Sequence, residues 1–287
     1  MTCTLQEAAD LAKLLHWDGN KDAKQSYDRA LFLCDYLGRD KLICDVTPED
    51  LKDYKTYLKA KGNKGSTINR KMACVSRMWE AAAEKGYVSM SYKPYHKREK
   101  EPKGRVRWLF PEEEKALGKW FIDQGRKELA DHLYLSCDTG LRTAESLHID
   151  HCHVTDQGVW VEPVALEDEF EDDWFSKNAE TRVVPLTNRC RKIISARGNH
   201  SPIFEGLPYH TIYHWWVKAR YELFDGDKGI TPYVTRHTCA SRLVQKKMHL
   251  NDIKKWMGHK KLSTTEIYAK NSVHDIEYGV ELLESFS

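Results

Sequence analysis

Two arginines, a histidine and a tyrosine in the second half of the chain are of types that could bind and attack a phosphate. Arg142 lies in the segment 139–145, and Arg236, His259 and Tyr268 lie in the run 233–268. His259 follows Arg236 by 23 positions, and Tyr268 follows His259 by 9. A phenolic oxygen can attack phosphorus, while guanidinium groups bind phosphate bidentately and stay charged. Together, these residues could transfer a phosphodiester to a tyrosine.

Two further side chains lie beside these arginines in the sequence. Glu145 is three positions after Arg142, so the two share one face of a helix. The alternative there is a surface ion pair that contributes roughly 0.2 to 0.5 kcal/mol. Tyr233 precedes Arg236 and His237 at helical spacing and faces the same way. A tyrosine with a pKa of about 10 is a poor proton acceptor at neutral pH. Tyr233 could therefore bind the phosphate, while His237 or solvent takes the proton.

Taken together, these segments resemble the active site of the tyrosine recombinase (phage integrase) family. Residues 233–238 are similar to its His-x-x-Arg-His-Thr box, except that Tyr233 stands where a histidine is usual. Residues 256–268 resemble its Leu-Gly-His and nucleophile segments. Lys177, five residues before an Arg-Val-Val-Pro-Leu strand, lies where the family has a β-hairpin lysine. By the same resemblance, His237 is more often a structural support.

The resemblance implies roles for the residues. Arg142 and Arg236 hold the nonbridging oxygens of one DNA phosphate, and His259 donates a hydrogen bond to such an oxygen. Tyr268 attacks phosphorus to give a 3′-phosphotyrosyl link. Lys177 protonates the departing 5′ oxygen. The chain is then expected to be a site-specific DNA recombinase, an integrase that uses no metal and no nucleotide cofactor.

Partners follow from the same resemblance. Double-stranded DNA, self-association into a synaptic tetramer, and an accessory DNA-bending or directionality factor are all compatible with it. Two alternatives stay open at this point: a type IB-like DNA topoisomerase, and a non-catalytic DNA-binding regulator with a decayed site. An assay for a covalent adduct and for strand exchange separates the three.

The charge distribution supports a nucleic-acid partner. The net charge is only +2, but residues 52–107 hold 16 Lys and Arg against 5 Asp and Glu, whereas residues 1–51 hold 6 against 10. Such a cationic band releases counterions from phosphates. The alternative is an ordinary solvated basic surface. The residues that we expect to contact DNA are Lys59, Lys61, Lys64, Arg70, Lys71, Lys97, Arg98, Lys103 and Arg105.

The apolar and turn patterns predict a mainly α protein with a small antiparallel sheet, arranged as a two-domain DNA clamp. Helices are expected after the capping-box pattern of Thr4 and Glu7, over 22–37, from Thr47 and Pro48 to about 61, and from 66 or 67 to Gly86. Strands are expected at 158–162 and 181–186. The parts are an N-terminal helix (1–20), a helical core-DNA-binding domain (21–92), a basic linker (93–107), a mixed α/β catalytic domain (108–270), and a tail helix (271–287) that could dock in trans.

Other features are less specific. The sequence has no stretch of eighteen apolar residues and no signal-peptide pattern, and its eight cysteines are scattered, which predicts a cytoplasmic protein. The family resemblance implies that it would be nucleoid-associated and allows a viral or mobile-element origin. Histidines 148, 151 and 153 with Cys152 indicate a metal site only weakly, because adjacent ligands do not easily converge on one ion. The acidic run 167–173 either restrains Lys177, points away from the duplex, or is a spacer.

Overall fold

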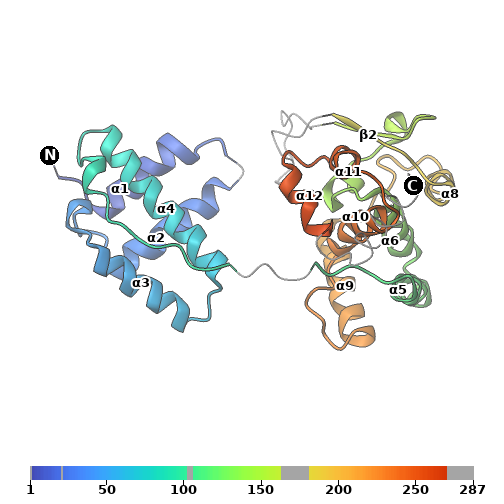
Figure 1. Cartoon of the computed structure of the whole chain (residues 1–287), viewed down its shortest axis with the longest axis horizontal. Coiled ribbons are helices and arrows are strands. Elements are labelled where there is room, and N and C mark those ends of the chain that lie inside the picture. Colours follow the sequence, from blue (N-terminus) through green and yellow to red (C-terminus); the bar gives the residue numbers. More distant parts are fainter. Residues whose placement is uncertain (1, 21, 102–105, 163–180, 270–287) are drawn as a thin grey trace, which may run out of the picture. The chain divides into compact units, whose positions relative to one another are not determined.

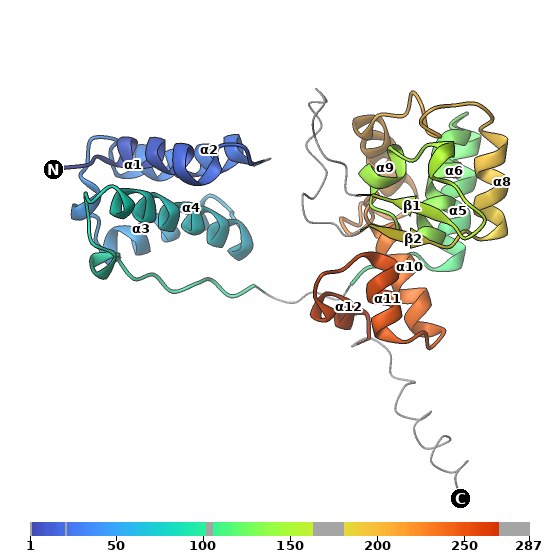
Figure 2. The same ribbon diagram turned by 90° about the horizontal axis from the view of Figure 1, so that it is seen from above.

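The chain forms two compact units, and the division between them falls between Lys103 and Gly104 in the sequence. A computed structural model describes residues 2–20, 22–101, 106–162 and 181–269 (Figures 1 and 2). Helices make up most of the described chain, and the two short strands pair in one antiparallel sheet. The expected fold class is therefore confirmed. No helix among the described residues is long and apolar enough to cross a membrane.

The N-terminal unit consists of the four expected helices. They are α1 (Leu5–Ala12, continued by a π-helical turn Lys13–Trp17), α2 (Ala23–Leu37), α3 (Pro48–Ala60) and α4 (Gly65–Glu84), with short 3-10 turns at Ile43–Asp45 and Met90–Tyr92. Helices α1 and α2 both pack against α4 (Figure 2). Because α1 contributes Leu5 and Ala8 to the same buried core as the other helices, residues 1–20 are part of this unit and not a separate element.

Local chemistry fixes where two of these helices begin. The Thr4 hydroxyl accepts a hydrogen bond from the Glu7 amide (3.2 Å), and the Glu7 carboxylate accepts one from the Thr4 amide (2.8 Å). Thr47 and Asp50 make the same reciprocal pair at α3, where Pro48 occupies the first helical position. Each cap stabilises its helix by about 1 kcal/mol. Both starts agree with the sequence prediction.

Part of the segment expected to be a linker is held against the N-terminal unit. The Asn69 side chain donates to the Glu99 carbonyl (2.9 Å) and accepts from the Glu99 amide (2.8 Å). The Glu99 carboxylate pairs with Lys55 and with Lys59, each at 2.8 Å. A side chain at Gly65 would come within 2.7 Å of the Lys100 carbonyl oxygen, so the glycine permits this close approach. Residues 93–101 therefore belong to the N-terminal unit.

The C-terminal unit is mainly helical around a two-stranded hairpin. Its elements are α5 (Pro111–Asp123), α6 (Lys127–Thr139), α7 (Thr143–Leu147), a 3-10 turn (His151–His153), β1 (Val159–Val161), β2 (Arg182–Val184), α8 (Asn188–Ala196), α9 (Tyr209–Leu223), α10 (Val234–Gln245), α11 (Leu250–Met257) and α12 (Leu262–Ala269). Helix α10 packs against α6, α11 and α12, while α11 also packs against β2. These contacts bring four distant segments together.

The hairpin is paired in a single register. Val159 lies opposite Val184, and Val161 lies opposite Arg182. Val159 and Val184 are fully buried in the larger core of this unit. Gly158, just before β1, has a φ of +149°, and a side chain there would overlap the Val184 carbonyl oxygen. The sheet therefore requires glycine at this position.

We expect Gly158→Ala to destabilise the protein by about 3 kcal/mol, because the new Cβ forces β1 away from β2 and the backbone is strained for any other residue. The measurement is the free energy of unfolding in denaturant.

Gly125→Ala is the matched control. Gly125 also has a positive φ, +70°, but no atom lies within 4 Å of an added Cβ. It should cost only about 1 kcal/mol, the strain of the left-handed backbone alone. Equal losses in the two variants would contradict the steric argument.

Candidate active site

Arg236 is the centre of the site and is completely buried. It lies on α10, and its guanidinium donates through Nη1 to the Gly140 carbonyl (2.6 Å) and through Nη2 to the Met257 carbonyl. Gly140 ends α6 in a left-handed conformation just before Arg142, and Met257 ends α11 just before His259. The Arg236 Nε atom has no hydrogen-bond partner among the described residues. One side chain thus connects the two turns that carry Arg142 and His259.

Glu145 is a buried carboxylate shared by two arginines. Its Oε1 pairs with Arg142 Nη1 at 2.6 Å, and its Oε2 pairs with Arg182 Nη2 at 2.7 Å. Its Oε2 also accepts from the Arg142 amide (2.8 Å), at the start of α7. The Arg142 side chain is 35% exposed, whereas those of Arg182 and Glu145 are 8% exposed. Arg142 is therefore the member of this group that an incoming phosphate can reach.

His259 and Tyr268 lie next to each other in the site. Their rings are nearly parallel, with centroids 6.4 Å apart. His259 follows Gly258, which ends α11 at a φ of +62°. Its Nδ1 is hydrogen-bonded to the Thr265 hydroxyl (3.0 Å) on α12, so Nε2 is the ring nitrogen that a phosphate oxygen can use. The Tyr268 side chain is only 4% exposed.

The Tyr268 hydroxyl is hydrogen-bonded to His237. The distance from Tyr268 Oη to His237 Nδ1 is 2.9 Å. Tyr233, which is 47% exposed, places its ring edge-on to His237 with centroids 5.0 Å apart. The structure therefore puts His237, and not Tyr233, in contact with the hydroxyl of Tyr268.

Burial and the arginines set the charge states of the site. Burial lowers the pKa of Arg236 to about 10, with Arg142 adding to the effect. Burial also lowers the pKa of His237 and of His259 to about 4, and Arg236 lowers both further. The pKa of Glu145 is held at about 2 because Arg182, Arg142 and Arg236 together outweigh its burial. Burial raises the pKa of Tyr268 to about 12.

At neutral pH, these shifts leave a concentration of positive charge beside a neutral tyrosine. Arg142 and Arg182 share the single carboxylate of Glu145. His237 and His259 are both uncharged. Such an arrangement binds one anionic group by charge and by N–H donors. In the free protein, the proton stays on Tyr268.

Of the predicted catalytic residues, the structure brings together Arg142, Glu145, Arg236, His259 and Tyr268, with Tyr233 at the rim. Lys177 lies outside the described residues. The acidic run 167–173 and the tail helix 271–287 also lie outside them.

Sequence reasoning missed the contacts of Arg182 and left the role of His237 open. Arg182 was assigned only to a strand, although a cation inside a short apolar strand is a signal of a buried partner. His237 was considered as a proton acceptor or, by the family resemblance, as a structural support, and nothing in the local pattern indicated that its ring meets Tyr268, which is 31 residues later.

Some of the expected DNA-contacting residues of the N-terminal unit are paired with other residues of the protein, and others are exposed. Lys59 pairs with Glu99, and the Lys97 carbonyl accepts from Lys55 Nζ. Arg98 pairs with Glu101 at 3.3 Å. Lys64 and Arg70 are exposed at the start of α4. Lys103 and Arg105 lie outside the described residues.

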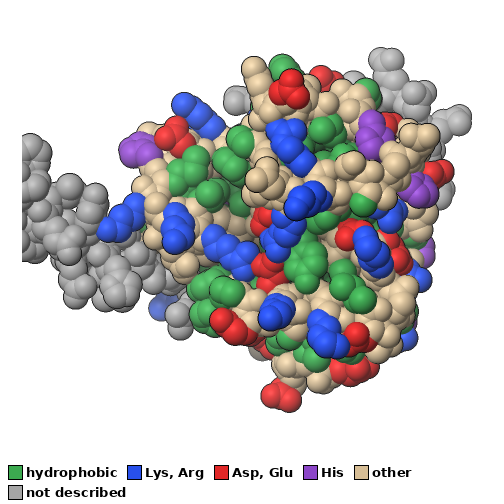
Figure 3. Space-filling view, turned by 90° about the vertical axis from the view of Figure 1, so that its right-hand side faces the viewer, with side chains coloured by type: hydrophobic (Ala, Val, Ile, Leu, Met, Phe, Trp, Pro, Cys, Tyr) green, Lys and Arg blue, Asp and Glu red, His purple; other side chains and the backbone are tan. Residues whose placement is uncertain are grey.

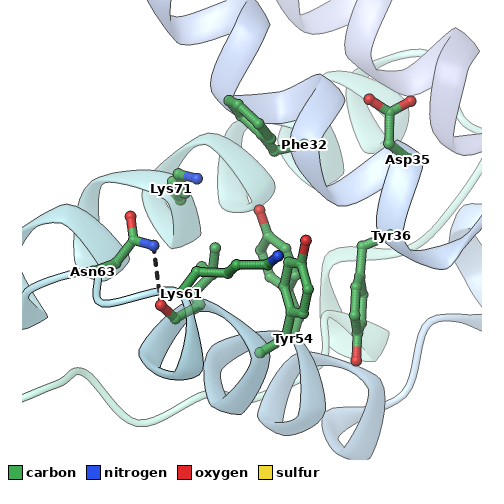
Figure 4. A pocket seen from close by; sticks show the side chains of 9 residues that line it. Phe32, Asp35, Tyr36, Tyr54, Lys61, Asn63 and Lys71 are labelled. Carbon is green, nitrogen blue, oxygen red and sulfur yellow. Dashed lines mark hydrogen bonds between the residues drawn. The ribbon is translucent and has the colours of Figure 1, made fainter.

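Lys61 and Lys71 line a cavity of about 470 Å³ between α2, α3 and α4 (Figure 4). Lys71 Nζ lies 3.9 Å from the centroid of the Phe32 ring, and Lys61 Nζ lies 5.6 Å from that of Tyr57. Burial lowers the pKa of Lys71. Figure 4 shows Asn63 beside them, where it caps the end of α3 by donating to the Leu58 carbonyl (2.9 Å). Aromatic rings thus support both ammonium groups at the surface.

Charge is mixed on the face of the C-terminal unit drawn in Figure 3. Lysine and arginine side chains are interspersed there with aspartate and glutamate. The described residues contain no group of three His, Cys, Asp or Glu side chains that could hold a metal ion. In the 148–153 segment, His153 Nδ1 accepts from the Asp150 amide (2.9 Å), a local turn contact.

Comparison with known families gives two matches. The model of the phage integrase family matches residues 107–274, and that of the phage integrase SAM-like domain matches residues 10–100. Among characterised relatives, the tyrosine recombinase XerA of Saccharolobus solfataricus is 27% identical over 260 residues, covering 84% of this chain and 79% of that protein. The tyrosine recombinase XerC of Staphylococcus carnosus is 24% identical over 244 residues, covering 77% and 76%.

Two solved structures are similar in fold. The Tn1549 transposon integrase in complex with a circular intermediate DNA superimposes with a TM-score of 0.79 at 15% identity, covering 98% of this chain and 99% of that one. A lambda integrase tetramer bound to a Holliday junction gives 0.76 at 18% identity, covering 93% and 77%.

The buried histidines predict a loss of stability in mild acid. His132, His237 and His259 have pKa values of about 4 in the folded protein because of burial, against about 6.5 when unfolded. Between these values the unfolded chain binds more protons. The free energy of unfolding should therefore fall as the pH drops from 6.5 to 4, by about 1.4 kcal/mol per pH unit for each fully affected histidine.

Denaturation series at several pH values measure this slope. His237→Gln should reduce it. His210→Gln, at an exposed position on α9, should leave it unchanged. A slope that survives unchanged in His237→Gln would show that this histidine does not titrate as argued.

Proposed function

Because the chain belongs to the phage integrase family of tyrosine recombinases, we propose that the residues gathered around Arg236 cleave DNA through a 3′-phosphotyrosyl intermediate. The protein is a site-specific DNA recombinase. The observation that carries the proposal is the convergence of Arg142, Arg236 and His259 beside Tyr268.

The first step joins protein to DNA. The Tyr268 Oη atom attacks the scissile phosphorus, a P–Oη bond forms, and the P–O5′ bond breaks. Arg142 and the free Nε of Arg236 bind the nonbridging oxygens, and His259 donates from Nε2. Lys177, by family resemblance, protonates the departing 5′ oxygen. A 5′ hydroxyl of another strand then attacks the phosphorus and loses its proton, the P–Oη bond breaks, and Tyr268 regains its proton as the phosphodiester is restored. The bond energy stays in the protein link, so no nucleotide cofactor is needed.

The proton of Tyr268 passes to His237 Nδ1, with which it is already hydrogen-bonded. In the free protein this transfer is unfavourable, because His237 has a pKa of about 4 and Tyr268 one of about 12. A bound phosphate offsets the positive field of Arg236, which raises the basicity of His237. Tyr233 supports the His237 ring from its edge and replaces the histidine that is usual in the family. The bound DNA phosphate therefore makes His237 basic enough to accept the Tyr268 proton.

Double-stranded DNA also contacts the N-terminal unit. Support comes from the exposed Arg70 and Lys64, from the ammonium groups of Lys61 and Lys71, and from a groove of about 590 Å³ along α4. Arg70, Arg77, Lys93 and Arg98 line this groove. The Tn1549 integrase, which shares this fold, was solved with DNA.

Assembly into a synaptic tetramer is part of the same proposal. The lambda integrase, of the same fold, forms a tetramer on a Holliday junction. A groove of about 470 Å³ between α10, α11 and α12 is lined by apolar side chains, among them Val244, Met248 and Leu262. We propose that residues 271–287 of a neighbouring subunit, which the sequence predicts to be helical, occupy this groove. An accessory DNA-bending or directionality factor fits this scheme, as does action in the cytoplasm on nucleoid DNA.

The two alternative functions are not favoured. The characterised relatives are tyrosine recombinases, and the phage integrase family model spans the whole described C-terminal unit from residue 107. A decayed regulator would have no reason to keep Arg236 buried and doubly hydrogen-bonded beside a buried tyrosine.

A nicked suicide duplex carrying the recombination site tests the chemistry. Wild-type protein should form a covalent adduct, and Tyr268→Phe should form none. Arg236→Ala should slow single-turnover cleavage by about 10³-fold, the size of one lost charge-stabilising group. Denaturing gel electrophoresis measures the adduct.

Tyr213→Phe is the control, because Tyr213 is an exposed tyrosine on α9. Its adduct rate should equal that of the wild type. An adduct that persists in Tyr268→Phe would disprove the assignment of the nucleophile, and relaxation of supercoiled plasmid without strand exchange would point to a topoisomerase.

Arg70→Ala tests the interface of the N-terminal unit. It should weaken duplex binding at every sequence and reduce the slope of log Kd against log salt by about 1, because one phosphate contact is lost. Fluorescence anisotropy at several salt concentrations gives this slope.

Arg39→Ala provides the comparison. Arg39 is an exposed arginine of the same unit that pairs with Asp35 at 2.7 Å. Binding should not change in this variant. The interface would be misplaced if Arg39→Ala and Arg70→Ala gave the same salt slope.

A further inference from the structure

We propose that Arg182 is a positioning residue that fixes Arg142 and the turn before His259 at the distance a phosphate requires. Arg182 is the first residue of β2. The inference rests on the proposed function of the site, because it assigns a role in the same phosphotransfer.

The contacts of Arg182 reach two segments from a third. Its Nη2 and Nη1 atoms lie 2.7 Å and 3.3 Å from the two oxygens of Glu145, and its Nε donates to the Trp256 carbonyl at 3.2 Å. Its side chain is 8% exposed. A planar guanidinium that makes three such bonds has little freedom to rotate. The strand β2, the start of α7 and the end of α11 are thereby held together.

Glu145 transmits this constraint to Arg142. Each carboxylate oxygen is shared, so that Oε1 contacts Arg142 Nη1 and Oε2 contacts the Arg142 amide, while Arg182 holds the same two atoms. Apart from burial, which acts in the other direction, Arg182 has the largest influence on the Glu145 pKa and holds it low. Without Arg182, the carboxylate would lose its fixed orientation and would be free to follow Arg142.

Gly258 transmits the constraint to His259. A Cβ at Gly258 would lie 2.9 Å from Arg182 Nη1 and 3.0 Å from its Cζ. The guanidinium therefore packs directly on the backbone of the turn, in a space that only glycine leaves open. His259 is the next residue, so a shift of Arg182 also shifts this imidazole. A displacement of about 1 Å at such a site can cost about a hundredfold in rate.

The test compares two substrates in single-turnover cleavage. One is the suicide duplex with a natural scissile phosphate, and the other carries a methylphosphonate there, which lacks the negative charge that the arginines bind. Arg182→Ala should be about a hundredfold slower than wild type on the phosphate, with duplex affinity unchanged. On the methylphosphonate, its rate should come within about threefold of the wild type, as should that of Arg142→Ala.

Arg189→Ala is the matched control. Arg189 also binds carboxylates in this unit, with Nε 3.0 Å from Asp138 and Nη1 2.8 Å from Glu114, but it does not contact Glu145. Its rate relative to wild type should be the same on both substrates. Arg182→Lys keeps the charge but loses the planar guanidinium group. Its cleavage rate on the phosphate should lie between those of wild type and Arg182→Ala, and it serves as the test if Arg182→Ala does not fold.

Three results are distinguishable. No adduct with wild-type protein would refute the proposed function itself. Wild-type rates in Arg182→Ala on the phosphate, or equal slowing on both substrates as for general destabilisation, would overturn the role of Arg182 and leave the function standing. An Arg182→Ala rate that is low on the phosphate but close to the wild-type rate on the methylphosphonate supports the inference.

Discussion

Three guanidinium groups gathered near one carboxylate are the constraint on which the C-terminal unit depends. Arg142 and Arg182 pair with Glu145, and Arg236 adds a third positive charge that is fully buried. Like charges in a buried site repel, so the cluster persists because peptide carbonyls and Glu145 hold each group. Since one carboxylate does not neutralise three cations, a net positive charge remains. A DNA phosphate is the natural group to balance it.

The same burial keeps the Tyr268 hydroxyl protonated in the free protein. Tyr268 is 4% exposed, and burial raises its pKa to about 12, so it is protonated at neutral pH. Its hydrogen-bond partner His237 is a weak base in the free protein, because burial and Arg236 lower its pKa to about 4. Burial alone accounts for the raised pKa of Tyr268, which Arg236 opposes, whereas burial and Arg236 act together on His237. Under the proposed mechanism, a bound phosphate would offset the charge of Arg236 and raise the pKa of His237, which links substrate binding to the base that takes the Tyr268 proton.

Local signals in the sequence were sufficient for the helices and for the spacing of the site. Thr47, Pro48 and Asp50 lie within four positions, so the start of α3 could be predicted without tertiary information. The positions of Arg236, His259 and Tyr268 were identified because one continuous segment, 233–268, resembles the tyrosine recombinase family in residue types and spacing. These predictions rest on neighbours along the chain.

Contacts between distant segments could not be predicted in the same way. Residues 93–101 were expected to be a linker because their composition is basic and proline-containing, yet Asn69 binds the backbone of Glu99 from 30 residues away. The partner of Arg182 lies 37 residues earlier in the chain. His237 and Tyr268 meet only because α10 packs against α12. In each case the side chain alone does not reveal its partner.

The most direct test of this account is the pKa of His237 measured by NMR in the Tyr268→Phe protein, free and bound to an uncleaved duplex. The account predicts that the pKa rises from about 4 when a natural scissile phosphate is bound, and that it rises much less with a methylphosphonate at the same position. An unchanged pKa with the natural phosphate would show that the arginine cluster does not receive that phosphate, and would contradict the account.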